Sequence, residues 1–142
     1  MRIPKPVLAG FALLTFLSLV PATPAKAQAY LHALSDLRSA RVYLQMETRP
    51  DLADAVQHSV NEINKAIDEI KIVATREGKD TWQTPPPQSG GDPAAPIHNA
   101  VRLLREARGD LGPAADSPDN NGLRDRSIKH IDEALHRLER FM

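Results

Sequence analysis

Apolar side chains recur at helical spacing in four separate segments of this chain. An α-helix advances roughly 100° per residue, so residues three and four positions apart share one face. The four sets are Ala33, Leu37, Ala40 and Leu44; Val56, Val60, Ile63, Ile67, Ile70 and Ala74; Ile97, Ala100, Leu104, Ala107 and Leu111; and Ile128, Ile131, Leu135, Leu138 and Met142. Four amphipathic helices that each have one apolar face need one another for burial.

The second half of the chain repeats the pattern of the first half. With an offset of 67, residues 33–44 and 100–111 share six identities in twelve positions, including Arg41 with Arg108. With an offset of 68, Ser59, Ile63 and Ala66 align with Ser127, Ile131 and Ala134. Hydrophobic register alone does not readily align two arginines, so we infer a duplicated helix-turn-helix unit. The predicted fold is all-α: an antiparallel four-helix bundle made of two tandem helical hairpins joined by a Pro/Gly-rich crossover.

Proline and glycine mark the expected boundaries of these elements. The predicted ranges are hairpin one at 29–77, the crossover at 78–96 and hairpin two at 97–142. Pro50 suits the first turn of a helix that runs to about residue 77, where Gly78 suits its C-terminal end. The last helix is expected to begin near Asn121-Gly122, capped by a neighbouring Asn or Asp, and to continue to the C-terminus.

The crossover has a composition that cannot continue either neighbouring helix. It contains Pro85-Pro86-Pro87 and Gly90-Gly91, and it has few apolar residues to bury. Its one large side chain is Trp82. We expect Trp82 to pack on the outside of the bundle rather than to contact a ligand, because isolated aromatic residues usually serve packing.

The first 27 residues have the pattern of a secretory signal peptide. Residues 1–6 carry two positive charges, residues 7–20 form a nearly unbroken apolar run, and Ala25-Lys26-Ala27 supplies the small-x-small cleavage pattern. The alternative is an uncleaved membrane anchor, but this run is shorter than the roughly 20 residues that span a bilayer. We therefore expect cleavage after residue 27, a single four-helix domain at 28–142, and a periplasmic or secreted protein without stable membrane insertion.

Charge and cysteine content exclude several functional classes. The chain has 18 basic and 18 acidic residues, but Arg2, Lys5 and Lys26 belong to the signal, which leaves 15 basic residues against 18 acidic ones. A nucleic-acid-binding protein needs a basic face, so we expect no nucleic-acid partner. The chain has no cysteine, which excludes disulfides, thiolate metal sites and cysteine nucleophiles.

Histidine is the residue type that favours a metal-binding alternative. The five histidines are His32, His58, His98, His130 and His136. Measured against the apolar stripes, His58, His98, His130 and His136 point toward solvent. Several have an acid one helical turn away, a spacing that also describes ordinary surface charge pairs. The candidate metal ligands are His130, His136 and Asp132.

Two specific metal motifs do not fit. Residues 133–136 have the Glu-x-x-His spacing of di-iron bundles, but the equivalent of His136 on the paired helix is Asp68, so the second copy is missing. A calcium loop with Gly122 in sixth position puts Ser117 and Ile128 where an aspartate and a glutamate are required. Neither pattern predicts a metal centre.

No catalytic motif is present in the sequence. There is no Gly-x-Ser-x-Gly elbow, no phosphate-cradling glycine loop and no His-Glu-x-x-His pattern. Ser127, His130 and Asp132 are close in sequence, but on a helix they point in different directions. We expect no catalytic residues, no cofactor and no enzymatic activity.

Arg41 and Arg108 are equivalent residues at the edge of the apolar faces. Each lies roughly 40° from the neighbouring leucine of its stripe, where a buried guanidinium needs a partner. Asn64 and Asp132 occupy the matching edge of the second helix in each hairpin. We expect two equivalent polar seams, Arg41 with Asn64 and Arg108 with Asp132, that fix helix register; recognition of an anionic ligand is the alternative.

The stretch Tyr30-Leu31-His32-Ala33-Leu34-Ser35-Asp36-Leu37-Arg38-Ser39-Ala40-Arg41 is a distinctive opening, and Ile128-Lys129-His130-Ile131-Asp132-Glu133-Ala134 is a distinctive last helix. Together with Gly78-Lys79-Asp80 and Gly122-Leu123-Arg124, these segments resemble an uncharacterised family of small exported bacterial helical-bundle proteins. The resemblance covers most of the mature chain. It implies an exported helical bundle and brings no activity or site residues across.

The expected function is a non-enzymatic interaction or scaffold module of the cell envelope, with an unknown protein partner or a second copy of the chain. Off-stripe apolar residues such as Val42, Met46 and Ile72 are candidates for that contact surface. The alternative is a periplasmic bundle that binds a metal or a small ligand through histidines.

Overall fold

The structure is a computed structural model that describes residues 25–87, 91–112 and 120–142. These residues form four α-helices and two short 3₁₀ turns, and no strand occurs among them. The elements are α1 (Ala25–Gln45), η1 (Pro50–Leu52), α2 (Ala53–Arg76), α3 (Pro96–Leu111), α4 (Leu123–Leu138) and η3 (Glu139–Phe141). The predicted all-α fold class is confirmed.

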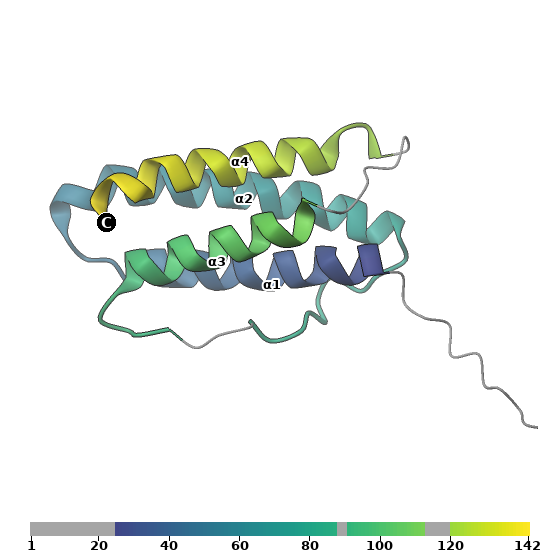
Figure 1. The fold of residues 1–142 in the computed structure, drawn as a ribbon, viewed down its shortest axis with the longest axis horizontal. Helices are drawn as coiled ribbons and strands as arrows, with labels where there is room; N and C mark the ends of the chain where they lie inside the picture. Colours follow the sequence, from purple (N-terminus) through teal and green to yellow (C-terminus); the bar gives the residue numbers. More distant parts are fainter. Residues whose placement is uncertain (1–24, 88–90, 113–119) are drawn as a thin grey trace, which may run out of the picture.

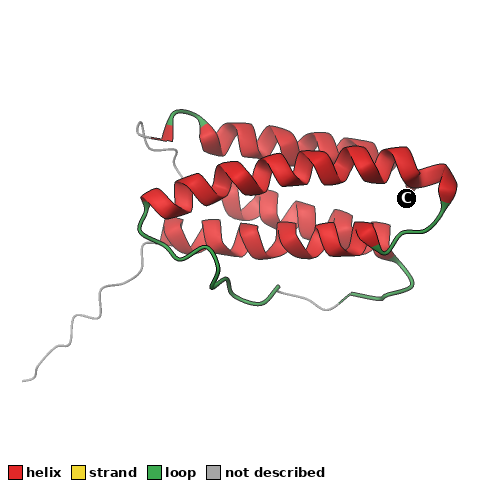
Figure 2. Ribbon diagram, turned by 180° about the vertical axis from the view of Figure 1, so that it is seen from behind, coloured by secondary structure: helices red, strands yellow, loops and turns green. Residues whose placement is uncertain are grey.

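The helices pack as a four-helix bundle in which each neighbouring pair is antiparallel (Figure 1). The closest packing is between α1 and α3 and between α2 and α4, while α1 with α2 and α3 with α4 make smaller contacts. Because α2 and α3 run in the same direction, the crossover returns along the length of the bundle to reach the start of α3 (Figure 1). The view from behind shows the crossover following one side of the bundle (Figure 2).

The four apolar stripes meet in one core. Ala33, Leu37, Ala40 and Leu44 of α1 are fully buried, and so are Ala100, Leu104, Ala107 and Leu111 of α3. On the other pair, Ile63, Ala66 and Ile70 match Ile131, Ala134 and Leu138, all fully buried. The same positions are therefore buried in both hairpins. Because α1 packs mainly on α3 and α2 mainly on α4, each stripe is covered mainly by a helix of the other hairpin.

Two specific bonds hold the crossover to α1. The guanidinium of Arg38 donates to the carbonyl oxygen of Thr81 over 2.8 Å, and the backbone N–H of Gly91 donates to the hydroxyl of Tyr43 over 3.0 Å. The two anchor points lie at the beginning and near the end of the crossover.

The helices begin and end near the predicted proline and glycine residues, with local differences. Pro50 begins a 3₁₀ turn ahead of α2, and Gly78 ends α2 with φ +75°, where Lys79 N–H donates to the carbonyl oxygen of Ala74. The predicted Asn or Asp cap on α4 is wrong: the cap residue is Gly122, with φ +75° and no side-chain hydrogen bond. The last helix also tightens to a 3₁₀ turn at Glu139 instead of continuing as an α-helix.

Two predictions fall on parts of the chain outside the described residues. Most of the export signal lies there, at residues 1–24, and so does most of the loop tested as a calcium site, at residues 113–119. Ala25-Lys26-Ala27 forms the first turn of α1. Cleavage after residue 27 would therefore shorten α1 by that turn and leave the rest of the helix. Within the described ranges, no helix is long and apolar enough to cross a membrane.

Candidate functional site

The structure brings the residues of both predicted polar seams together. Arg41 Nη1 donates to Asn64 Oδ1 over 2.7 Å, between α1 and α2. At the equivalent place between α3 and α4, Arg108 Nε donates to Asp132 Oδ1 over 2.5 Å, and this carboxylate raises the pKa of the guanidinium. The second seam is about half exposed at both side chains. Each arginine is thus engaged by one residue of its own hairpin, which suits helix register.

The candidate metal ligands do not converge. Among the described residues, no three His, Cys, Asp or Glu side chains are placed to hold a metal ion. Asp132 is bonded to Arg108, and His136 is exposed with its Nε2 2.9 Å from Arg140 Nη2. Glu133, the other end of the Glu-x-x-His motif, is exposed as well.

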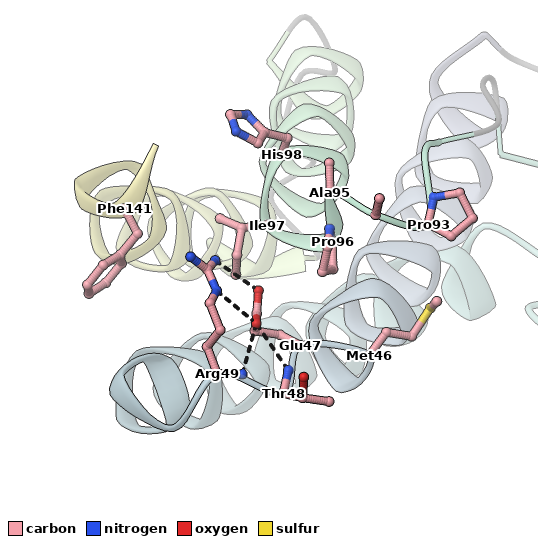
Figure 3. A pocket seen from close by; sticks show the side chains of 11 residues that line it. Met46, Glu47, Thr48, Arg49, Pro93, Ala95, Pro96, Ile97, His98 and Phe141 are labelled. Carbon is pink, nitrogen blue, oxygen red and sulfur yellow. Dashed lines mark hydrogen bonds and ion pairs between the residues drawn. The ribbon is translucent and has the colours of Figure 1, made fainter.

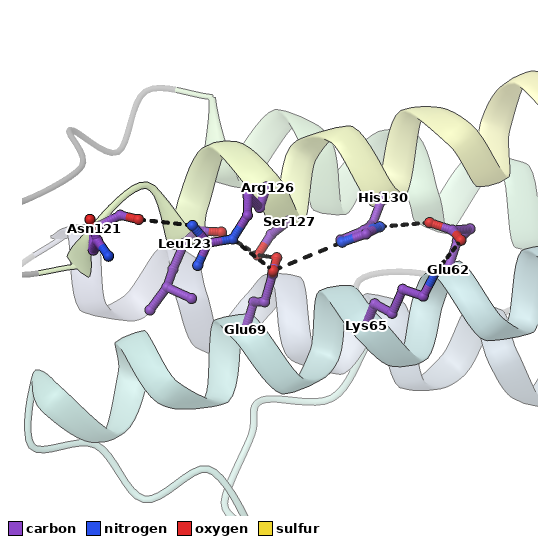
Figure 4. A network of polar contacts seen from close by, with 8 residues as sticks. All are labelled: Glu62, Lys65, Glu69, Asn121, Leu123, Arg126, Ser127 and His130. Carbon is purple, nitrogen blue, oxygen red and sulfur yellow. Dashed lines mark hydrogen bonds and ion pairs between the residues drawn. The ribbon is translucent and has the colours of Figure 1, made fainter.

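His130 does not point into solvent as its angle predicts, and that prediction is wrong. Its side chain is 24% exposed and lies between α4 and α2, with Nδ1 2.6 Å from Glu62 Oε2 (Figure 4). Its Nε2 lies 3.8 Å from Glu69 Oε1, two helical turns farther along α2 (Figure 4). The angle on one helix misjudged this residue because the neighbouring helix, packed against that flank, supplies two carboxylates that cover the ring.

The contacts around His130 extend along the α2–α4 interface (Figure 4). Glu62 also accepts a bond from Lys65 over 2.8 Å, and Glu69 accepts bonds from Arg126 and from the Ser127 hydroxyl. We call Glu62, Lys65, Glu69, Arg126, Ser127 and His130 the His130 network. Its charged groups are satisfied by one another, so it can fix the register of two helices.

Burial and hydrogen bonding shift the pKa of Glu62 in opposite directions. Burial raises the pKa of its carboxyl, but the bonds from Lys65 and His130 outweigh that effect, and the pKa lies below its ordinary value. Glu62 is therefore held as a carboxylate at neutral pH. An offset of 68 makes Glu62 and His130 equivalent positions of the two hairpins, so the two halves differ in charge at the place where they face each other.

A second polar stripe follows α3. Arg102, Glu106 and Asp110 succeed one another at four-residue spacing, and Arg102 donates to Glu106 over 3.3 Å. Asp110 Oδ2 and Glu106 Oε2 are buried and accept no hydrogen bond from the described residues. Burial raises the pKa of Asp110, the charge of Glu106 adds to the rise, and His32 on α1 opposes it. Sequence reasoning missed this stripe, because Asp110 sits beside a helix-ending glycine and looks like a surface acid.

Trp82 is not packed on the bundle, and the expectation that it would be is wrong. Its side chain is 84% exposed, and the ammonium of Lys71 lies 5.7 Å from the centroid of its ring. Lys71 also lines a shallow hollow on the outer side of α2, together with Asp68, Ile72, Thr75 and Arg76. Ile72 is exposed there. We call Trp82 and this hollow the Trp82 face.

The backbone that leads into Trp82 is held by two hydrogen bonds. Its own N–H donates to Asp80 Oδ1 over 2.9 Å, and the preceding residue, Thr81, is buried with its carbonyl bonded to Arg38. Because this backbone is already held, covering the indole would order only its side-chain torsions. No sequence signal distinguished this arrangement from packing, since the crossover has no helical period.

Another hollow lies at the end of the bundle where the α1–α2 loop, the start of α3 and the C-terminal turn meet (Figure 3). It has a volume of about 660 Å³. Its lining includes Met46, Glu47, Arg49, Ile97, His98 and Phe141, with Pro93 and Pro96 at the entry to α3. We call it the end cavity.

Glu47 and Arg49 form a bonded pair inside the end cavity (Figure 3). Arg49 Nε and Nη2 donate to the two oxygens of Glu47 over 3.1 and 3.0 Å, and the backbone N–H groups of Thr48 and Arg49 also donate to Oε1. These bonds from Arg49 lower the pKa of Glu47. The Glu47 side chain is 5% exposed and that of Arg49 is 55% exposed.

Comparison with protein-family models, with curated proteins and with solved structures finds no match to this chain.

Proposed function

We propose that this chain is an exported, non-enzymatic helical bundle that serves as an interaction or scaffold module of the cell envelope, and that it belongs to the exported family it resembles. The signal pattern of residues 1–27 supports export. The equivalent buried positions of the two hairpins support an origin by duplication of one hairpin.

The hydrogen bonds and ion pairs of the polar groups support a non-enzymatic role. In the part of the chain that the structure describes, both arginine seams and the His130 network are engaged by partners on adjacent helices. A catalytic group instead needs a reactive atom that faces a substrate.

The observation that carries the interaction role is the exposure of Trp82. Tryptophan has a large apolar surface and is enriched among the residues that dominate protein–protein binding. The charged residues Asp68, Lys71 and Arg76 around the Trp82 face suit the polar rim of such a contact. We propose that the Trp82 face binds a protein partner of the envelope.

Site-specific cross-linking tests this role. A photoreactive residue at position 83, beside Trp82, should capture one protein in cells, and mass spectrometry identifies it. Trp82→Ala should lower the affinity for that purified protein at least tenfold, because loss of an anchoring Trp costs about 2 kcal/mol or more. The matched control is Met142→Ala, an exposed apolar residue at the end of the last helical turn, which should leave the affinity unchanged.

An unchanged affinity of the Trp82→Ala variant would contradict the proposed surface. Light scattering of the purified protein tests the second occupant, another copy of the chain. A dimer that Trp82→Ala abolishes would make self-association the function of this face.

The alternative function is a bundle that binds a metal or a small ligand. No contact supports the metal part, since the histidines are dispersed over the described helices. Thermal unfolding with Zn²⁺, Cu²⁺ and Ni²⁺ tests it, because a metal at about 100 times its dissociation constant adds roughly 2.7 kcal/mol to the stability. The end cavity supports the binding of a small ligand.

A further inference from the structure

We propose that the end cavity binds a small carboxylic acid, with the carboxylate on Arg49 and the hydrocarbon part against Pro96 and Phe141. This site is independent of the Trp82 face. It goes beyond the role as an interaction module, and either proposal can fail without the other.

The cavity has the size of a small-ligand site, and its lining combines polar groups with a few apolar side chains. Its volume of about 660 Å³ lies within the range of roughly 300–1,000 Å³ that such sites occupy. Met46 and Phe141 are exposed on its sides, with 46% and 41% of their surface in contact with water. Pro93 and Pro96 add apolar surface that a hydrocarbon chain or ring would cover, while Ile97 is 3% exposed and contributes only a small contact.

Arg49 is held in a position from which it can bind an anion. Its bonds to Glu47 use Nε and Nη2, and Nη1 points away from Glu47 (Figure 3). A guanidinium has five N–H donors, so three remain after the two bonds to Glu47. The Nη1–Nη2 edge can therefore donate two parallel bonds to a carboxylate, the geometry that arginine prefers.

Glu47 makes this arginine rigid, and it also limits what binds. Its almost fully buried carboxylate accepts four hydrogen bonds from Thr48 and Arg49. The side chains of Glu47 and Arg49 therefore do not need to reorganise when a ligand enters. Because the pair is neutral overall, long-range attraction is weak, and recognition needs hydrogen bonds and apolar burial together. An acid with an apolar body satisfies both requirements, whereas a small inorganic anion satisfies only the first.

The sequence sets this pair apart from the repeated pattern of the bundle. An offset of 67 aligns Glu47 with Ala114 and Arg49 with Asp116, so the second hairpin has no copy of the pair. Helix packing common to both hairpins therefore does not require it.

Methyl NMR of the purified protein tests the site with octanoate as the probe. The methyl signals of Met46 and Ile97 should shift in a saturable manner, and octanamide, which has the same chain without the charge, should bind at least tenfold more weakly. Arg49→Gln should raise the dissociation constant for octanoate at least tenfold. Arg49→Lys should restore only part of the affinity, because an ammonium cannot form the paired bonds.

The matched control is Arg108→Gln, which removes another partly exposed, acid-paired arginine at the far end of α3 and should leave octanoate binding unchanged. Circular dichroism verifies that each variant retains its helix content. The proposal is overturned if octanoate shifts neither methyl signal, if octanamide binds as well as octanoate, or if a folded Arg49→Gln variant binds with the parent affinity.

Discussion

At the scale of single residues, Asp110 is an acid whose charged form the fold disfavours. Among the described residues its Oδ2 is buried without a hydrogen-bond donor, and burial raises its pKa. An acid whose pKa is higher in the folded than in the unfolded state binds more protons when folded. Its contribution therefore makes the protein less stable as the pH rises above the ordinary range of an aspartate.

We expect Asp110→Asn to raise the free energy of unfolding at pH 7 by about 1 kcal/mol, because it removes a buried unsatisfied charge and offers an N–H to Glu106. The gain should shrink as the pH falls through the ordinary pKa of an aspartate, 3.8, because Asp110 then becomes protonated in the unfolded state as well. Urea titrations from pH 3.5 to 7.5 measure it. Asp68→Asn is the control, since this acid is exposed on α2 and its replacement should change stability by less than about 0.5 kcal/mol. A destabilised Asp110→Asn variant would contradict the argument.

His130 makes the opposite kind of contribution. His130→Ala removes the partner 2.6 Å from a Glu62 side chain that is only 10% exposed, and should lower the free energy of unfolding by about 1–3 kcal/mol. The pKa of Glu62 is lowered in the folded state. Its contribution to the stability of the protein is therefore present at neutral pH and is lost as the pH falls through the pKa that Glu62 has in the folded protein. The difference between parent and variant should therefore narrow in acid.

Chemical denaturation of three variants separates this bond from general effects of histidine loss. His130→Gln retains a donor and should recover part of the stability that His130→Ala loses. His98→Ala, at an exposed residue on α3, should be close to the parent. Equal stability of the His130→Ala and His98→Ala variants would show that the His130 network contributes nothing measurable.

At the scale of helices, two glycines provide a matched pair. A Cβ added at Gly78 or at Gly109 would meet no atom within 4 Å, but Gly78 has φ +75° and Gly109 lies inside α3. Gly78→Ala should therefore destabilise the protein by about 1–2 kcal/mol through backbone strain alone. Gly109→Ala should stabilise it by about 0.5–1 kcal/mol, because alanine favours the helix. Thermal unfolding followed by circular dichroism measures both changes, and effects of the same sign would contradict the assignment of these two helix positions.

The helices themselves were predictable from the apolar periods, because each stripe is continuous and the proline and glycine residues interrupt the pattern at the right places. His130 was not predictable, since its angle on α4 describes one helix and its partners Glu62 and Glu69 come from another. Trp82 lies outside any period, so nothing in the sequence separates packing from exposure. The end cavity joins three segments far apart in the chain, and Glu47 and Arg49 gain their role only from that meeting.

At the scale of the whole molecule, the main interfaces lie between the two hairpins rather than within them. The helices that pack most closely, α1 with α3 and α2 with α4, belong to different hairpins. The apolar stripes alone did not reveal this choice, because every stripe is equally able to cover any other. A consequence is that neither hairpin has a complete core of its own.

Separate hairpins test this organisation. Fragments 28–87 and 91–142 should each have little helix alone at micromolar concentration, and their mixture should regain the helix signal of the intact chain as a 1:1 complex. The crossover then contributes mainly by raising the effective concentration of one hairpin for the other. Circular dichroism with analytical ultracentrifugation measures both properties. A cooperative unfolding transition of either fragment alone would contradict the prediction.

The charges at the interface also predict which hairpins pair. Because Glu62 and His130 are equivalent positions that contact each other, two copies of the first hairpin would place Glu62 against Glu62, and like charges at a packed interface oppose association. The mixed complex should therefore be favoured at least tenfold over a dimer of fragment 28–87 at neutral pH. Glu62→Gln in that fragment should reduce the preference, whereas Asp68→Gln, a change of the same charge at an exposed site on α2, should not. Equal affinities for the mixed complex and the first-hairpin dimer would show that apolar packing alone selects the partner.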